Sequence, residues 1–128
     1  MKITFYGRGN DMGLQLDIQG RVMVASPEGE LDHHQAERLR PAIDSAYDKS
    51  PCKHLILDMG GISFMDSSGI GMIIGRYKNA EKRGGQLALT NMNESIAKLF
   101  DVSGLAKIVL RTATVKDALD VLGGSLNE

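Results

Sequence analysis

Alternating hydrophobic and polar residues mark the early part of the chain. Every second residue is hydrophobic over residues 13–20, which is the period of a β-strand with one solvent-facing side. The alternation continues over residues 21–31, where Pro27 and Gly29 are expected to end the strand because neither suits the interior of a regular ladder. With a turn between them, the two runs predict an antiparallel strand pair.

A helical spacing of hydrophobic residues follows directly. Asp32 is a good N-cap residue, and the hydrophobic positions after it recur every three or four residues as far as Lys49: Ala36, Leu39, Ile43, Ala46 and Tyr47. Pro41 interrupts the pattern, because an interior proline removes one backbone hydrogen bond at a cost of about 3 kcal/mol. We predict one amphipathic helix with a kink at Pro41 on its solvent side.

Short apolar runs and helical patterns alternate through the rest of the chain. The runs predict strands at residues 54–58, 86–90 and 107–110, and residues 60–65 are interpreted as a hinge. Capping residues place three helices: one from near Ser67 to the glycines at 84 and 85, one from Glu94 to a stop at Ser103 and Gly104, and one from Thr114 through Leu122. The apolar stripe predicted for the first of these three helices is Ile70, Ile73, Ile74, Tyr77 and Ala80.

Strands that alternate with helices across short loops are typical of an α/β domain with a mostly parallel sheet. The pattern predicts five strands and four helices, with the antiparallel pair at the beginning. No repeat or linker-like stretch divides the 128 residues. We therefore assign residues 13–122 to a single domain and treat residues 123–128 as a tail, and the pattern does not define the structure of residues 1–12.

Composition narrows the class of protein. Hydrophobic residues make up 42% and charged residues 24% of the chain, which argues against disordered and membrane-embedded classes. With a net charge of −1 and scattered lysines and arginines, the chain has no electrostatic footprint for nucleic acid or an anionic membrane. Cys52 is the one cysteine, so no internal disulfide forms, and no apolar run has signal-peptide or membrane-spanning length. We expect a cytoplasmic protein with protein or small-molecule partners.

The segment from Met65 to Gly71 carries the candidate chemistry, because it lies where a strand and its loop lead into a helix. Ser67 is predicted at the helix N-terminus, where unpaired backbone N–H groups and the positive end of the helix dipole favour a phosphate or carboxylate. Asp66, Ser67 or Ser68 would equally serve as an ordinary helix N-cap. The spacing alone leaves both interpretations open.

Three glycines lie inside the same predicted helix, at positions 69, 71 and 75. Each costs about 0.5–1 kcal/mol relative to alanine, so something must compensate for them. Close packing on the sheet is one explanation, and a bare helix surface for a partner's backbone is the other. Gly75 fits close packing better, whereas Gly69 and Gly71 fit both explanations.

Three separated blocks of sequence resemble one known family. They are Glu-Leu-Asp-His-His at residues 30–34, the block at residues 63–78 that contains Asp-Ser-Ser-Gly, and residues 99–105. In this order they closely resemble the sporulation anti-sigma factor antagonists, and the resemblance extends from about Gly13 to Leu122. It implies the STAS fold and a regulatory protein that is not an enzyme, for which we expect no cofactor.

The resemblance also implies partners and site residues. In unphosphorylated form, such antagonists bind an anti-sigma factor that is also a serine kinase, and the sigma factor is released. The kinase then phosphorylates the first serine of the Asp-Ser-Ser-Gly block, which is Ser67 here, and a serine phosphatase restores the binding form. The expected partner-binding residues are Asp32, Asp66, Ser67, Ser68, Gly69 and Gly71.

Other functions fit the residues less well. A serine hydrolase would need the first glycine of a nucleophile elbow, which is absent before Ser67, and no histidine has a motif that places it near this serine. A nucleotide-binding loop would need a Gly-Lys-Ser/Thr ending. A metal site at residues 30–34 would need ligands that face one point, which adjacent helical residues do not provide. A stress-signalling pathway with a different kinase stays open for the same fold.

Three further residues are placed without a definite role. We expect Arg76 on a solvated helix face, with contact to a partner as the alternative. We expect Cys52 where a loop enters a strand, and Tyr77 in the packing stripe of its helix.

Overall fold

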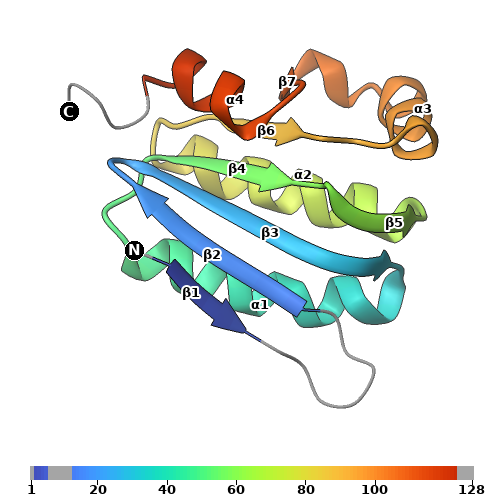
Figure 1. Ribbon diagram of the computed structural model, residues 1–128, viewed down its shortest axis with the longest axis horizontal. Helices are drawn as coiled ribbons and strands as arrows, with labels where there is room; N and C mark the ends of the chain where they lie inside the picture. Colours follow the sequence, from blue (N-terminus) through green and yellow to red (C-terminus); the bar gives the residue numbers. More distant parts are fainter. Residues whose placement is uncertain (1, 6–12, 124–128) are drawn as a thin grey trace.

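The computed structural model describes residues 2–5 and 13–123, which form one seven-stranded mixed sheet with helices on its faces (Figure 1). The strand order is β1-β2-β3-β4-β6-β7, and β5 pairs with the second half of β3. The pairs β1–β2 and β2–β3 are antiparallel and the others are parallel, as predicted for the sheet. The strands are β1 (Lys2–Phe5), β2 (Gly13–Gln19), β3 (Val22–Leu31), β4 (His54–Asp58), β5 (Gly61–Met65), β6 (Leu87–Thr90) and β7 (Leu110–Thr112).

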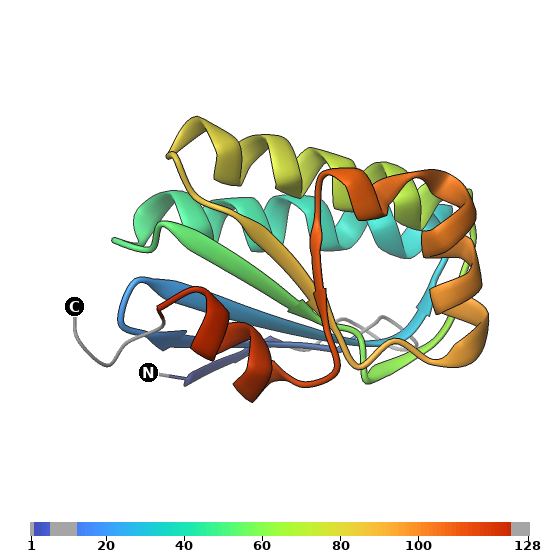
Figure 2. The same ribbon diagram turned by 90° about the horizontal axis from the view of Figure 1, so that it is seen from above.

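Two long helices, α1 (His33–Lys49) and α2 (Ser67–Lys82), lie on one face of the sheet, and α4 (Val115–Val121) lies on the other (Figure 2). Helix α3 (Glu94–Ser103) and a 3-10 turn at Leu105–Lys107 connect β6 to β7. The predicted α/β class and its four helices are confirmed within the described residues. No helix in this part of the chain has the length and apolar character needed to cross a membrane.

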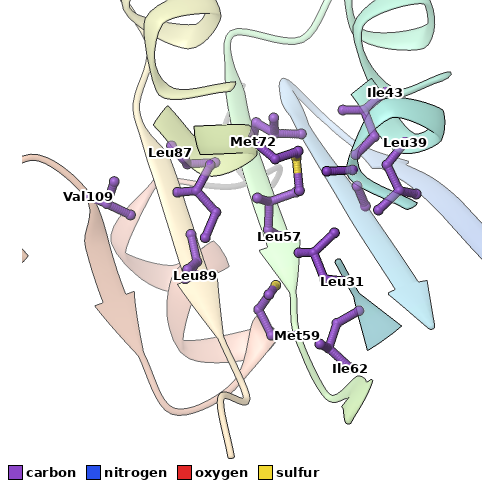
Figure 3. Close-up of a cluster of buried hydrophobic side chains, with 14 of the residues drawn as sticks. Leu31, Leu39, Ile43, Leu57, Met59, Ile62, Met72, Leu87, Leu89 and Val109 are labelled. Atoms are coloured by element: carbon purple, nitrogen blue, oxygen red, sulfur yellow. The ribbon is translucent and has the colours of Figure 1, made fainter. Parts of the chain in front are cut away.

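The main hydrophobic core fills the space between the sheet and the layer of α1 and α2 (Figure 3). Leu39 and Ile43 of α1, Met72 of α2 and Leu57 of β4 are all buried there. A second, smaller cluster joins α4 to the opposite face of the sheet. Because full burial of such a side chain contributes about 1.5–3 kcal/mol, these clusters hold the helices in fixed positions on the sheet.

The prediction of five strands was wrong, because the described residues contain seven. β1 lies in the segment for which no structure was predicted, and it pairs with β2 at the edge of the sheet. β5 occupies the residues interpreted as a hinge. Ile62 and Met65 are buried in β5 and the two residues between them are exposed, so the period-two pattern of a strand is interrupted.

β3 continues through Pro27 and Gly29 to Leu31, beyond its predicted end. Its parallel partner changes from β4 to β5 after Ala25, so Pro27 lies at a gap in the ladder on that side. A register shift between Gly29 and Glu30, with φ at 114° for Gly29, marks a β-bulge that glycine accommodates. The two residues expected to stop the strand instead occupy the places where its pairing is irregular.

The helix ends follow the capping residues seen in the sequence. At the start of α4 the backbone N–H of Asp117 donates to the Thr114 hydroxyl (3.1 Å), and Gly104 adopts a left-handed conformation (φ 82°) after α3. The strand predicted at residues 107–110 was misplaced, since β7 begins at Leu110 and the preceding residues include the 3-10 turn. Pro41 lies at an exposed position within α1, and a kink there stays a prediction.

Candidate functional site

Two helix N-termini lie side by side at the carboxyl ends of β3 and β5, which we call the site edge of the sheet. β3 and β5 are parallel neighbours, and their last residues, Leu31 and Met65, pair in register. An aspartate follows each strand, Asp32 before α1 and Asp66 before α2. The backbone N–H of Asp66 donates to the Leu31 carbonyl oxygen (3.4 Å). The sequence blocks around Asp32 and Asp66 therefore meet at one place, where both helices begin (Figure 1).

Both aspartates cap their helices. The backbone N–H of Gln35 donates to the Asp32 carboxylate (2.9 Å), and the backbone N–H of Ser68 donates to the Asp66 carboxylate (2.8 Å). The choice of N-cap that the spacing left open is thus settled for Asp66. Ser67 becomes the first residue of α2 and is not needed as a cap.

The hydroxyl group of Ser67 is accessible. The side chain is exposed, and it makes no hydrogen bond to any residue that the structure describes. The positive end of the α2 dipole lies beside it, although the backbone N–H groups of Ser68 and Gly69 already donate to the Asp66 carboxylate (2.8 Å) and carbonyl (3.0 Å) oxygens. A phosphate carried on this hydroxyl group would break no side-chain hydrogen bond of Ser67 to a described residue, and it would lie at the favourable end of the helix dipole.

Gly69 is a packing residue. It is buried, and a Cβ atom at this position would lie only 2.2 Å from Met65 Cγ and 3.3 Å from Leu31 Cδ2. A side chain at position 69 would therefore force the Met65 side chain to move. Of the two explanations for this glycine, the structure supports close packing.

Gly71 and Gly75 are open positions. A Cβ atom at either one would meet no atom within 4 Å, so the prediction that Gly75 packs closely was wrong. Residues four apart lie on the same helix face, which puts Ser67, Gly71 and Gly75 in one line along α2. We call these three residues the glycine track. Beyond the Ser67 hydroxyl group, the track is helix surface without side chains.

Arg76 is buried, not solvated as predicted. Its exposed fraction is 4%, and its Nε lies 2.8 Å from Oδ1 of Asp44 in α1. Arg76 Nη2 donates to Asp44 Oδ2 (3.1 Å), and Asn79 Nδ2 donates to Asp44 Oδ1 (2.7 Å). Burial lowers the pKa of the Arg76 guanidinium, and the attraction of the Asp44 carboxylate opposes that effect. This ion pair ties the two helices of the candidate site together.

The predicted apolar stripe of α2 was rotated from the real one. The buried line consists of Gly69, Met72, Ile73, Arg76 and Ala80, whereas three residues of the predicted stripe are only half-buried: Ile70, Ile74 and Tyr77. Hydrophobicity misses this line because it includes a glycine and an arginine. The available signal was spacing, since positions 69, 72, 73, 76 and 80 keep the helical period.

The two histidines near Asp32 lie on the exposed side of α1. His33 Nε2 is 3.0 Å from Glu37 Oε1, and Arg38 Nε donates to His34 Nε2 (3.3 Å). Within residues 2–5 and 13–123, no three acidic, histidine or cysteine side chains converge as a metal site would require. The Asp32 carboxylate itself is engaged in helix capping.

The family model of the STAS domain matches residues 13–118, which extend from the start of β2 into α4. The chain belongs to the STAS domain family. The matched part of this STAS domain includes both helix N-termini of the candidate site, and β1 lies outside it.

This STAS domain is similar to anti-sigma factor antagonists. It is 39% identical over 100 residues to the anti-sigma F factor antagonist of Paenibacillus polymyxa, covering 77% of this chain and 86% of the relative. It is 35% identical over 109 residues to the anti-sigma-B factor antagonist of Bacillus subtilis, covering 85% and 90%.

Solved structures of SpoIIAA, an anti-sigma factor antagonist, match in two states. The unphosphorylated form matches with a TM-score of 0.68 at 31% identity, covering 86% of this chain and 97% of that one. The phosphorylated form, from Bacillus, matches with a TM-score of 0.66 at 35% identity, covering 84% and 97%. The resemblance seen in the sequence is confirmed.

Proposed function

We propose that this protein is an anti-sigma factor antagonist that acts in the cytoplasm by binding. In its unphosphorylated form it binds an anti-sigma factor that is also a serine kinase, and the sigma factor is released. Phosphorylation of Ser67 by that kinase ends the binding, and a serine phosphatase restores it. The protein itself performs no catalysis in this role.

The observation that carries the proposal is the position of Ser67 at the head of the glycine track. Its hydroxyl group is exposed and has no partner among the described residues, and Gly71 and Gly75 leave the adjacent helix surface open. A partner's backbone and a bound nucleotide can therefore approach this hydroxyl group closely. Such access is what a kinase requires of its substrate serine.

The charge of a phosphate explains how binding ends. A kinase that modifies Ser67 holds its nucleotide phosphates against this residue during transfer. The resulting phosphoserine carries about −1.5 to −2 charges, and it is repelled by those phosphates in a desolvated interface. A thousandfold loss of affinity corresponds to about 4 kcal/mol. This repulsion, with the loss of packing over Gly71, supplies such an amount without refolding.

The remaining candidate residues support the same role in two ways. Gly71 offers open surface to the partner. Asp66 and Gly69 hold the start of α2 in place, through a cap hydrogen bond and through packing on Met65. Asp32 caps the neighbouring helix next to Asp66, and this position supports a second contact with the partner.

Incubation of the purified protein with the anti-sigma kinase of its own organism and ATP tests the proposal. We expect one added phosphate, mapped to Ser67 by mass spectrometry, and loss of the complex. Ser67→Ala is expected to stay folded and bind constitutively, and Ser67→Asp to fold but bind poorly. Ser68→Ala is the matched control and is expected to accept phosphate normally. Loss of fold in both Ser67 variants, or a complex that survives phosphorylation, would refute the proposal.

The choice of kinase distinguishes two pathways. The similar proteins named above are antagonists of anti-sigma F and anti-sigma-B factors. We expect the sporulation kinase to bind, because the sequence blocks match the sporulation antagonists. Binding only to a stress-pathway kinase would keep the switch and change the sigma factor it controls.

A further inference from the structure

One end of the sheet face opposite α1 and α2 has no helix over it. Leu31 and Met65 are buried beneath the two long helices, so their neighbours Glu30 and Phe64, which pair in register, point to the opposite face. α4 packs on that face, but it contacts the first halves of the strands, around Val22. In Figure 1 α4 lies well away from β5. The N-cap residue of α3 does reach β5, where Asn93 Nδ2 donates to the Ile62 carbonyl oxygen (3.3 Å), but Phe64 stays exposed.

Phe64 is the exposed aromatic residue of this uncovered surface. Its exposed fraction is 47%, and it lies three residues before Ser67. A single exposed hydrophobic residue is common and needs no explanation. Phe64 differs from Val102 and Val121 because the acidic residues near it have no described ion-pair partner. The aspartates beside those two valines pair with Arg111 and Lys116.

The surface around Phe64 is acidic. Glu28 and Glu30 are both exposed, and neither has an ion-pair partner among the described residues. Glu28 lies against β5, since a Cβ atom on Gly61 would be 2.9 Å from Glu28 Cγ. β3 and β5 contain no lysine or arginine, so no positive charge on these two strands balances the glutamates.

We propose that Glu28, Glu30 and Phe64 form a docking surface for an arginine- or lysine-bearing segment of the anti-sigma kinase. The inference rests on the proposed function and adds a second contact to it. A guanidinium or ammonium group placed over the Phe64 ring gains a cation–π contact, and the two carboxylates accept charge-assisted hydrogen bonds from the same segment. The charge complementarity selects a basic partner and excludes an acidic one.

This docking surface differs from the glycine track in what it does. It lies on the sheet face, whereas Ser67 begins a helix on the other face, and the two meet at the site edge, where β5 leads into α2. A basic segment bound at Phe64 would hold the kinase next to Ser67 until phosphate transfer. Changes at Phe64 are therefore expected to raise the KM for phosphorylation and leave kcat nearly unchanged.

Binding of the purified kinase is measured for Phe64→Ser and Glu30→Lys, together with steady-state phosphorylation. We expect each variant to weaken binding at least about tenfold, as for a central aromatic or charged contact. Glu30→Lys should also reduce the salt dependence of binding. Val121→Ser and Asp48→Lys make matched changes at exposed positions on α4 and at the far end of α1, and both should bind normally. Circular dichroism and thermal melting establish that every variant is folded.

The outcomes separate the two proposals. If Phe64→Ser and Glu30→Lys bind the kinase as tightly as the wild-type protein does, the docking surface is overturned and the phosphorylation switch stays intact. Absence of any wild-type complex would overturn both. Phe64→Ser could instead change self-association and leave kinase binding unaltered. That result would assign the surface to a second copy of this chain, and it would also overturn the inference.

Discussion

The three glycines of α2 have different physical roles although they are only two and four residues apart. Gly69 is required because Met65 and Leu31 occupy the space of a side chain, whereas Gly71 and Gly75 have open space around them. Only the latter two positions carry the usual cost of glycine in a helix without compensation from packing. That distinction makes stability and binding separable within a single helix.

Alanine substitutions test this separation. We expect Gly69→Ala to destabilise the protein by about 1–3 kcal/mol through overpacking against Met65. Gly71→Ala and Gly75→Ala should stabilise the helix by about 0.5–1 kcal/mol. Gly71→Ala should nevertheless weaken kinase binding, because its methyl group lies on the glycine track. Urea denaturation and the binding assay measure the two effects, and equal stability changes at positions 69 and 71 would contradict the assignment.

Tyr47 makes the stability of the protein sensitive to high pH. Its hydroxyl group donates to the Lys53 carbonyl oxygen (2.6 Å), and burial raises its pKa above the ordinary value near 10 while the Arg83 charge partly offsets that rise. The folded state then holds this proton more tightly than the unfolded state does. The contribution of Tyr47 is complete below pH 10 and is lost as the pH rises from there towards the folded pKa.

Tyr47→Phe is the test of this linkage. At neutral pH the variant should lose about 1 kcal/mol with the hydrogen bond. The difference in free energy of unfolding between wild type and variant should shrink above about pH 10, because only the wild type pays for ionising this phenol. Tyr77→Phe is the comparison, because the exposed Tyr77 hydroxyl group donates to Glu81 (2.9 Å) and this bond also raises its pKa. We expect a smaller effect in the same direction for Tyr77→Phe, since solvent screens that interaction. A constant difference across the pH range would show that the Tyr47 proton is not linked to folding.

At the scale of the helices, the Arg76–Asp44 ion pair fixes α2 against α1. Arg76 is 4% exposed and Asp44 is 27% exposed, so the two partners differ in their access to water. The Nη1 atom of Arg76 has no hydrogen-bond partner in the described part of the chain, which leaves the arginine more dependent on Asp44 than the reverse. The pair therefore predicts an asymmetric response to substitution.

Removing the aspartate should cost more than removing the arginine. We expect Asp44→Ala to destabilise by about 3 kcal/mol, because it leaves a buried cation without its partner. Arg76→Met should cost less, since Asp44 retains Asn79 and solvent. Asp120→Ala, which breaks the exposed Lys116–Asp120 pair (3.3 Å), should change stability by less than about 1 kcal/mol. Urea denaturation of each single variant, and of the double variant at positions 44 and 76, measures the free energy of unfolding. Equal losses of stability for Asp44→Ala and Arg76→Met would rule out the asymmetry.

The elements that the sequence predicted well are those with a complete hydrophobic period and a cap. α1 runs between Asp32 and Lys49 as expected, and the α3 stop at Gly104 follows from a residue suited to positive φ. β5 escaped prediction because a bulge at Gly29 and two exposed residues broke its alternation. β1 lies in a segment where its pairing with β2 could not be read from local pattern alone.

The residues of the candidate site also fall into those that local sequence signals predict and those that depend on tertiary contacts. The sequence placed Ser67 at a helix start, because strand, aspartate and helical period are all local signals. It could not place Asp32 beside Asp66, because that depends on the in-register pairing of Leu31 with Met65 across distant segments. It also misplaced Arg76 and Gly75, since burial of one position on a helix depends on which neighbour packs there.

At the scale of the whole molecule, the site lies on a rigid frame. α1 and α2 pack on one sheet face over the core shown in Figure 3. Both helices begin where β3 and β5 end. Ser67 is exposed at this site edge and is not part of the core. A modification of Ser67 therefore changes the surface offered to a partner without removing any contact that holds the sheet and helices together.

The phosphorylated protein should consequently keep its fold. The phosphate gains a favourable position at the positive end of the α2 dipole, an effect of about 0.3–1 kcal/mol at an exposed helix end. Native-state hydrogen exchange, compared before and after phosphorylation, should change only around the β5–α2 junction, while β3, β4 and β6 keep their protection. The same comparison on Ser67→Ala treated with kinase and ATP gives the baseline. Loss of protection across the central strands would mean that the switch works by unfolding, and the interface repulsion argued for Ser67 would then be the wrong mechanism.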